Sequence, residues 1–307
     1  MADFVDGLWL EQYVEPQLLE DFRNYNDDFI GVLKRPNAAA IDKDGIKFNK
    51  LINNVGFHVN KTDDFVSKPM EGKKGFVAWD KLDTDPTSVT DKELRAMAFD
   101  KDAEVRKEHT NSWKLGVRDY VLNKLAPQTH VAGHMPVVRT TGEVFGNRRR
   151  MTYSDLMEYY VALETLNLND KNGWFMILCD HHRADLLHDR ANTKNYRDIQ
   201  IDLQTGELKK FFKLNFFENN DSPFYNAAGT KKSRGAIIGA TDQKASTFFY
   251  APNTVYHIEG VEVLKKERKT DTRSADPTSE MRLHSYGLCE KKQDHGFGAI
   301  VSDNKPV

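Results

Sequence analysis

The stretch Trp79-Asp-Lys-Leu-Asp-Thr-Asp-Pro-Thr-Ser-Val-Thr-Asp-Lys-Glu93 marks the point where the chain changes from strand-like to helix-like sequence. Just upstream, Gly75-Phe-Val-Ala-Trp79 is a short apolar run of strand character. Thr90-Asp-Lys-Glu93 has the capping-box pattern, in which the Thr90 hydroxyl and the Glu93 carboxylate satisfy free amides of a first helical turn. We therefore predict a strand ending near Trp79 and a helix beginning at Thr90.

The predicted helix runs from Thr90 to Leu125, and Pro127 follows its end. Apolar residues recur along it at spacings that fit one helical face. A helix of this length spans about 50 Å at 1.5 Å per residue. Its centre, Asp100 to Asn111, is highly charged, which favours a break or a solvated stretch there.

A projecting hairpin is predicted upstream, over residues 56 to 89. Phe57-His-Val59 and Gly75-Phe-Val-Ala-Trp79 are strand-like and flank the turn-rich run Lys68-Pro-Met-Glu-Gly-Lys-Lys-Gly75. Isolated two-stranded ribbons are marginal in water, so we expect this hairpin to need a partner. Residues 1 to 55 read as an arm that lies along a neighbour, with a turn at Ile41 to Gly45. The alternative is an ordinary N-terminal helix docked on its own domain.

The rest of the chain predicts mixed helices and strands. Residues 126 to 150 form a loop or hairpin, Thr152 caps a second helix, Trp174-Phe-Met-Ile-Leu-Cys179 is a buried strand, and Asp180 starts a short helix through Leu187. Further strands are predicted at residues 199–203, 212–216, 235–239, 255–263, 281–288 and 298–301.

Composition excludes several function classes. The formal net charge is −2, and the mean hydropathy of −0.65 is low for a compact core. No overall basic field exists to bind nucleic acid, no apolar run is long enough to span a bilayer, and the acidic N-terminal stretch does not resemble a secretory leader. Cys179 and Cys289 read as buried, reduced thiols of a protein made in the cytoplasm.

The one enzyme-like cluster is Cys179-Asp-His-His-Arg-Ala-Asp-Leu-Leu-His188. On a helix, His181, Asp185 and His188 share a face and have the donor types that bind zinc. A metal-dependent hydrolase is therefore an alternative. The second cluster that would complete a catalytic site is missing, and no glycine-rich phosphate loop occurs. We favour a capped surface helix with exposed histidines, and predict no catalytic residues, no metal site, no cofactor and no enzymatic activity.

In order, the predicted elements are an arm, a projecting hairpin, a long helix, a mixed lobe and closing strands. This order resembles the Hong Kong 97-like coat fold of tailed-bacteriophage major capsid proteins. The passage from Trp79 to Glu93 into Phe99-Asp-Lys-Asp-Ala-Glu-Val-Arg-Lys-Glu-His109 is similar to the passage from extended loop to spine helix in such coats. Trp174 to Asp180 with Ala184-Asp-Leu-Leu187, and Gly287 to Val301, resemble the buried strand with its short helix and the closing strands. Asp180 departs from the family, where many coats have proline or serine.

The resemblance implies an α+β coat fold with peripheral and axial domains. We expect the arm at 1–55, the extended hairpin loop at 56–89, the spine helix and start of the peripheral domain at 90–150, an axial-type lobe with helices around a central sheet at 151–250, and closing strands at 251–307. Candidate subunit contacts are Trp9, Lys68, Met70, Lys73, Lys74, Trp79, Arg148, Arg149 and Arg150. For the three arginines the alternative is a solvated loop.

The implied function is a major capsid protein that self-assembles as hexamers and pentamers into an icosahedral phage head around double-stranded DNA. It would be made in the host cytoplasm and end in the virion. Expected partners are other copies of the chain, a portal protein, separate scaffolding and decoration proteins, and non-specifically the packaged DNA, but no membrane. Alternatives to this function are an encapsulin-type compartment shell and a minor virion head protein.

Overall fold

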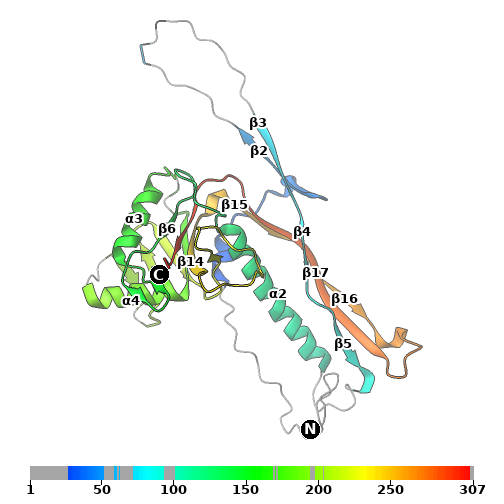
Figure 1. Cartoon of the computed structure of the whole chain (residues 1–307). Coiled ribbons are helices and arrows are strands. Elements are labelled where there is room, and N and C mark those ends of the chain that lie inside the picture. Colours follow the sequence, from blue (N-terminus) through cyan, green and yellow to red (C-terminus); the bar gives the residue numbers. More distant parts are fainter. Residues whose placement is uncertain are drawn as a thin grey trace.

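A computed structural model describes residues 27–51, 59–60, 62, 72–92, 101–168, 170, 172–193, 198–202 and 204–304. Two sheet-containing lobes share one long helix, and a hairpin projects from the body (Figure 1). The helices are α2 (Lys101–Leu125), α3 (Tyr153–Glu164) and α4 (Asp180–Thr193), with short 3-10 turns η1 (Asp28–Val32), η2 (Ala38–Ala40), η3 (Ala251–Asn253) and η4 (Arg268–Thr270).

The first lobe is built on an eight-stranded sheet ordered β10-β11-β12-β9-β14-β18-β6, with β13 beside β14. Its strands are β6 (Val137–Arg139), β9 (Trp174–Leu178), β10 (Ile199–Ile201), β11 (Leu208–Phe211), β12 (Leu214–Glu218), β13 (Phe224–Tyr225), β14 (Gln243–Tyr250) and β18 (Phe297–Val301). β12 and β6 run parallel to their neighbours β9 and β18, and the other pairs are antiparallel.

Both faces of this sheet are covered, which explains why β9 reads as continuously apolar. Met176 and Leu178 pack in one core with α3 and α4. Ile177 packs in a second core with α2 and with Phe29 of η1. Helices on both faces thus bury alternate residues of the same strand.

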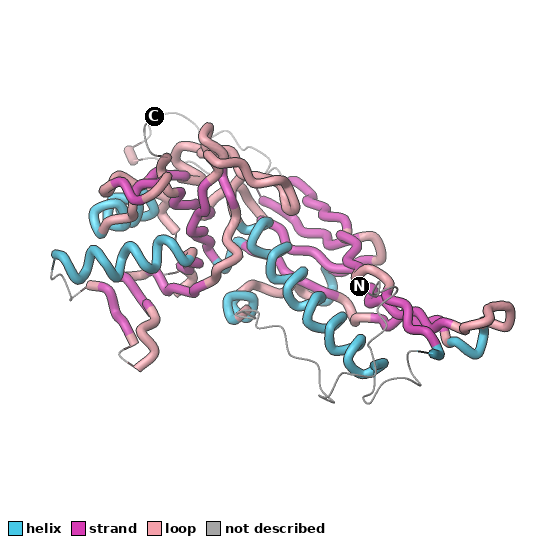
Figure 2. Tube along the Cα trace, turned by 60° about the horizontal axis from the view of Figure 1, so that its bottom comes forward, coloured by secondary structure: helices cyan, strands magenta, loops and turns pink. Residues whose placement is uncertain are grey.

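The second lobe is a thin sheet around β17 (Thr278–Lys291). β15 (Thr254–Ile258) and β16 (Glu262–Lys266) pair with different stretches of β17, as do β4 (Asp80–Asp83) and β5 (Thr87–Thr90). α2 lies along this sheet, and Figure 2 shows the helix running beside its strands. The residues of β17 alternate between buried and more exposed over most of its length, as expected for a sheet covered on one side.

The hairpin pairs β2 (Gly45–Leu51) with β3 (Gly72–Ala78), and β1 (Ile41–Asp42) extends the sheet. A projecting hairpin was predicted, but its first strand was wrongly placed. β3 pairs with residues assigned to the arm, and Phe57 and His58 lie outside the described residues. The arm-to-hairpin boundary at 55/56 therefore falls too late, because the turn predicted at Ile41 to Gly45 spans only two residues and leads directly into β2.

The long helix is confirmed in part. Thr90 ends β5, where its backbone pairs with that of Thr278 in β17, and helical residues follow it directly, as the predicted helix start requires. Asp91 and Lys92 are helical, and residues 93–100 lie outside the described part. α2 runs unbroken from Lys101, so of the two alternatives predicted for its charged centre the break is wrong over 101–111 and the solvated stretch is confirmed, since Arg106, Lys107 and Glu108 are exposed. Its polar centre packs through hydrogen bonds: the buried His109 ring contacts the Thr84 hydroxyl at 2.7 Å and the Thr87 hydroxyl at 3.0 Å.

Among the other predicted elements, some are confirmed and some are wrong. Thr152 caps α3 in a full capping box with Asp155, as expected. α4 extends to Thr193, well beyond the predicted end at Leu187. The region 255–263 is two strands instead of one, and residues 235–239 form a loop instead of a strand.

Candidate assembly surfaces

The hairpin is anchored at its base and exposed beyond it. Ile46 packs with Val255 and Leu288 in a small core, against which Val77 and Trp79 lie. Gly45 is required at the crossing, because a Cβ there would lie 2.1 Å from the Val77 carbonyl oxygen. Farther along β3, Phe76 is 52% exposed. A large ring on a ribbon that projects from the body is typical of a contact surface.

Trp79, a predicted subunit contact, contacts two residues of its own chain. Its indole N–H donates to the Asp42 carbonyl at 3.1 Å, and its ring lies 5.5 Å from that of His257. It therefore fixes the base of the hairpin. Lys73 and Lys74 lie on β3, and Trp9, Lys68 and Met70 lie outside the described residues.

On the face of the second lobe opposite α2, charged side chains form a connected set of ion pairs. Asp83 accepts from Arg282 at 2.5 Å and from His284 at 2.7 Å, and Lys81 lies 3.2 Å away. Burial would raise the pKa of Asp83, but the hydrogen bonds from His284 and Lys81 outweigh it and lower that pKa. Such a face favours a polar, oriented contact over an apolar one.

The edge of this sheet is also exposed. Every residue of β16 is exposed, including Val263 and Leu264, and among the described strands β16 pairs with β17 alone. An unpaired edge presents backbone donors and acceptors to another chain. Lys265 and Lys266 discourage indiscriminate pairing at this edge.

The three consecutive arginines, Arg148 to Arg150, differ in burial. Arg148 is buried and holds Asp185 with two hydrogen bonds, at 2.5 and 2.9 Å. It is therefore neither a subunit contact nor a solvated residue, which corrects that prediction. Arg149 is more exposed and lies 3.9 Å from Asp303, while Arg150 stacks over the Phe145 ring at 4.2 Å.

The histidine cluster is not a metal site within the described part of the chain, where no group of three or more His, Cys, Asp or Glu side chains is arranged to hold an ion. The expectation of exposed histidines holds for His188, while His181 is half-buried and His182 is fully buried, which corrects the expectation for His182. Its Nδ1 lies 2.8 Å from the Ser246 hydroxyl, and its Nε2 lies 3.0 Å from the Ser302 hydroxyl. Burial lowers the pKa of His182 to about 3, so the ring is neutral and structural.

The two cysteines are buried and free, as expected. Burial raises the pKa of Cys179 to about 11 and that of Cys289 to about 12. Neither thiol is a nucleophile near neutral pH. No helix among the described residues is long and apolar enough to cross a membrane.

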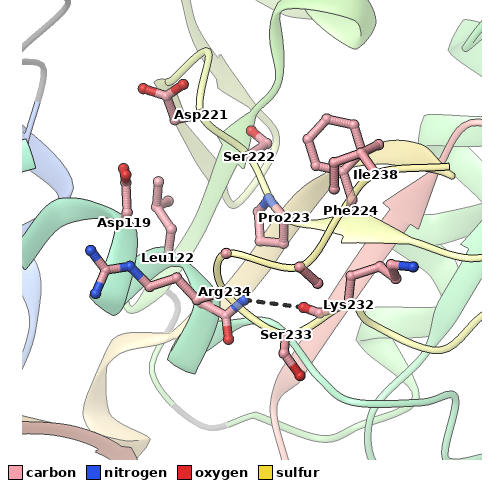
Figure 3. A pocket seen from close by; sticks show the side chains of 13 residues that line it. Asp119, Leu122, Asp221, Ser222, Pro223, Phe224, Lys232, Ser233, Arg234 and Ile238 are labelled. Atoms are coloured by element: carbon pink, nitrogen blue, oxygen red, sulfur yellow. Dashed lines mark hydrogen bonds between the residues drawn. The ribbon is translucent and has the colours of Figure 1, made fainter. Parts of the chain in front are cut away.

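A groove beside α2 was not predicted. We call it the α2 groove: an open cavity of about 260 Å³ between residues 119–123 of α2, the turn at 221–224 and the loop at 232–238 (Figure 3). Ile237 on that loop is 91% exposed. The signal in the sequence was the run Gly235-Ala-Ile-Ile-Gly239, in which two flanking glycines make a loop as plausible as the predicted strand.

Comparison with protein-family models and with curated protein sequences finds no match. Solved structures do match over nearly the whole chain. A capsid chain of cyanophage P-SCSP1u has a TM-score of 0.67 at 12% identity, covering 94% of this chain and 91% of that one. A chain of Mycobacterium phage Che8 has a TM-score of 0.62 at 12% identity, covering 98% of both.

The capsid chain of Ralstonia phage GP4 is similar to the same degree, with a TM-score of 0.62 at 12% identity, covering 100% of this chain and 98% of that one. Coverage of 94–100% of this chain in these three matches means that the likeness is to the fold as a whole and not to one lobe. The chain therefore has the Hong Kong 97-like coat fold of tailed-phage capsid proteins.

Proposed function

We propose that this chain is a major capsid protein that assembles as hexamers and pentamers into the icosahedral head of a tailed bacteriophage. The observation that carries the proposal is the fold match over the full length of capsid chains. The chain would reside in the virion, enclose double-stranded DNA, and meet a portal protein and separate scaffolding or decoration proteins.

The described surfaces fit this role. A hairpin with an exposed ring, a charged sheet face and an open sheet edge point away from the two cores, so each could meet a different neighbour. Many modest contacts become strong together when a shell closes. The polar composition of the chain is compatible with such contacts, because interfaces of this kind are about as polar as the rest of a protein surface.

A catalytic role is disfavoured by geometry. The hydrolase alternative needs Asp185 as a ligand, yet Arg148 binds both of its carboxylate oxygens and the Met151 N–H donates to one of them at 3.0 Å. The proposed role is structural.

The test is the mass and shape of the native assembly. We expect the purified chain to form shells of megadalton mass that are visible by electron microscopy. Deleting Pro69 to Gly75 removes four of the seven residues of β3 and should leave a folded subunit that forms no normal particles. Native mass of a monomer or dimer for the intact chain, or normal shells from the deletion variant, would refute the proposal.

A further inference from the structure

Two histidines from separate connecting segments face each other. His134 lies in the segment between α2 and β6, and His295 lies in the turn between β17 and β18. Their Nδ1 atoms are 3.2 Å apart, and their ring centroids are 5.4 Å apart. His134 is exposed and His295 is half-buried, so the pair can be reached from solvent.

The second ring nitrogen of His295 fixes its tautomer. Its Nε2 lies 2.9 Å from the Leu166 carbonyl oxygen, which can only accept a hydrogen bond. Nε2 therefore carries the proton, and in the neutral ring the lone pair of Nδ1 faces His134. A histidine that donates its other ring N–H to a carbonyl is the usual arrangement at metal sites, because that bond orients the ligand.

The backbone around the pair is also held in place. The Gly296 N–H donates to the His134 carbonyl at 3.2 Å, and the Asn253 side-chain amide donates to the His295 carbonyl at 2.6 Å. Gly296 has a φ of +80°, in the left-handed region that favours glycine. Both rings thus stand on ordered segments, which reduces the entropy cost of placing an ion between them.

The spacing of the two nitrogens fits zinc. Imidazole nitrogens bind Zn²⁺ at about 2.0–2.1 Å, so two of them in tetrahedral geometry lie about 3.3 Å apart. The Nδ1 atoms of His134 and His295 meet this requirement at 3.2 Å. Magnesium and calcium prefer oxygen ligands, whereas imidazole suits zinc, copper and nickel.

We propose that His134 and His295 bind one Zn²⁺ through their Nδ1 atoms. Within the described part of the chain no third His, Cys, Asp or Glu side chain completes the set, so water fills the remaining positions. The Nδ1 proton that His134 donates to His295 moves through water to Nε2 of the same ring, since the His134 side chain is exposed. This proposal revises the prediction of no metal site, which considered only the cluster at 179–188.

The ion would link the two lobes. The segment that carries His134 leads from α2 into β6, and the turn that carries His295 leads from β17 of the second lobe into β18 of the first. A metal that joins these two connections restrains the second lobe relative to the first. The inference goes beyond the proposed shell function and does not depend on it.

The test is calorimetric titration of the full chain with ZnCl₂, in whichever assembly state it purifies. We expect one ion per chain and no binding of MgCl₂. Because an ion that binds only the folded chain stabilises it, the melting temperature should rise by about 2–4 °C at a ten-fold excess of zinc over its Kd, and EDTA should reverse the rise.

Three variants separate a metal site from a simple hydrogen-bonded pair. His134→Gln keeps a side-chain N–H opposite His295 but no imidazole, so it should weaken zinc binding at least about ten-fold and leave the melting temperature in EDTA unchanged. His134→Cys supplies a thiolate, another zinc ligand, and should bind zinc. The control is His188→Ala, which removes an exposed histidine of α4 and should bind like the unaltered chain. No zinc binding by the unaltered chain, equal binding by His134→Gln, or loss of binding in His188→Ala would overturn the proposal.

Discussion

Arg148→Ala should destabilise the subunit severely, whereas Arg149→Ala, one residue away, should not. The side chains of Arg148 and Asp185 are 7% and 3% exposed, and two hydrogen bonds join them. Removing the arginine leaves a buried carboxylate without its counter-charge, which costs about 3–5 kcal/mol. Arg149 is 30% exposed and lies 3.9 Å from Asp303, so its loss should cost at most about 1 kcal/mol.

The assay is urea unfolding of unassembled subunits, followed by tryptophan fluorescence, because Trp174 is 1% exposed in the same lobe. The double variant Arg148→Met with Asp185→Leu removes both charges and should recover most of the loss. It should not recover all of it, because the Met151 N–H then lacks its acceptor, at about 1–3 kcal/mol. A cost below about 1 kcal/mol for Arg148→Ala, or equal costs for the two arginines, would refute the reasoning.

Three further predictions concern the core, the hairpin and a helix cap. Because burial lowers the pKa of His182 to about 3 from 6.5, the unfolded chain carries an extra proton between those values. Stability should therefore fall on acidification below pH 6.5, by up to about 1.4 kcal/mol per pH unit, and His182→Gln should flatten that slope in urea titrations at pH 7, 6 and 5. Gly45→Ala should open the hairpin base and abolish shells in electron micrographs, while Gly31→Ala, where a Cβ would meet nothing within 4 Å, should leave shells normal. Thr152→Ala removes the acceptor for the Asp155 N–H and should lower the free energy of unfolding by about 1 kcal/mol, whereas an unchanged urea midpoint would mean that the cap contributes nothing.

Sequence patterns predicted correctly those elements whose conformation depends on residues close to them in the sequence. The α3 cap needs only Thr152 and Asp155, which lie within one turn. The buried strand β9 needs only a run of apolar residues, because both of its faces are covered. The ordered series of such elements was enough to indicate the coat fold.

The misplaced elements depend on contacts far along the chain. β3 could have paired with either of two upstream runs, and the choice of β2 depends on Ile46 reaching Val255 and Leu288. Arg148 looked like a surface residue because its partner, Asp185, is 37 residues away. Single-sequence patterns do not contain these long-range pairings.

The orientation of the hairpin is set by the shared helix. Asp80 follows the hairpin directly and meets two residues of α2: the Tyr120 hydroxyl donates to its carboxylate, and Lys124 lies 3.1 Å from it. The Tyr120 oxygen in turn accepts the Cys289 N–H at 3.2 Å, and Lys124 reaches Glu290 at 3.3 Å. Helix α2, the hairpin base and β17 are therefore joined at one polar junction. Since α2 also packs on the sheet of the first lobe, the direction in which the hairpin projects is fixed relative to both cores.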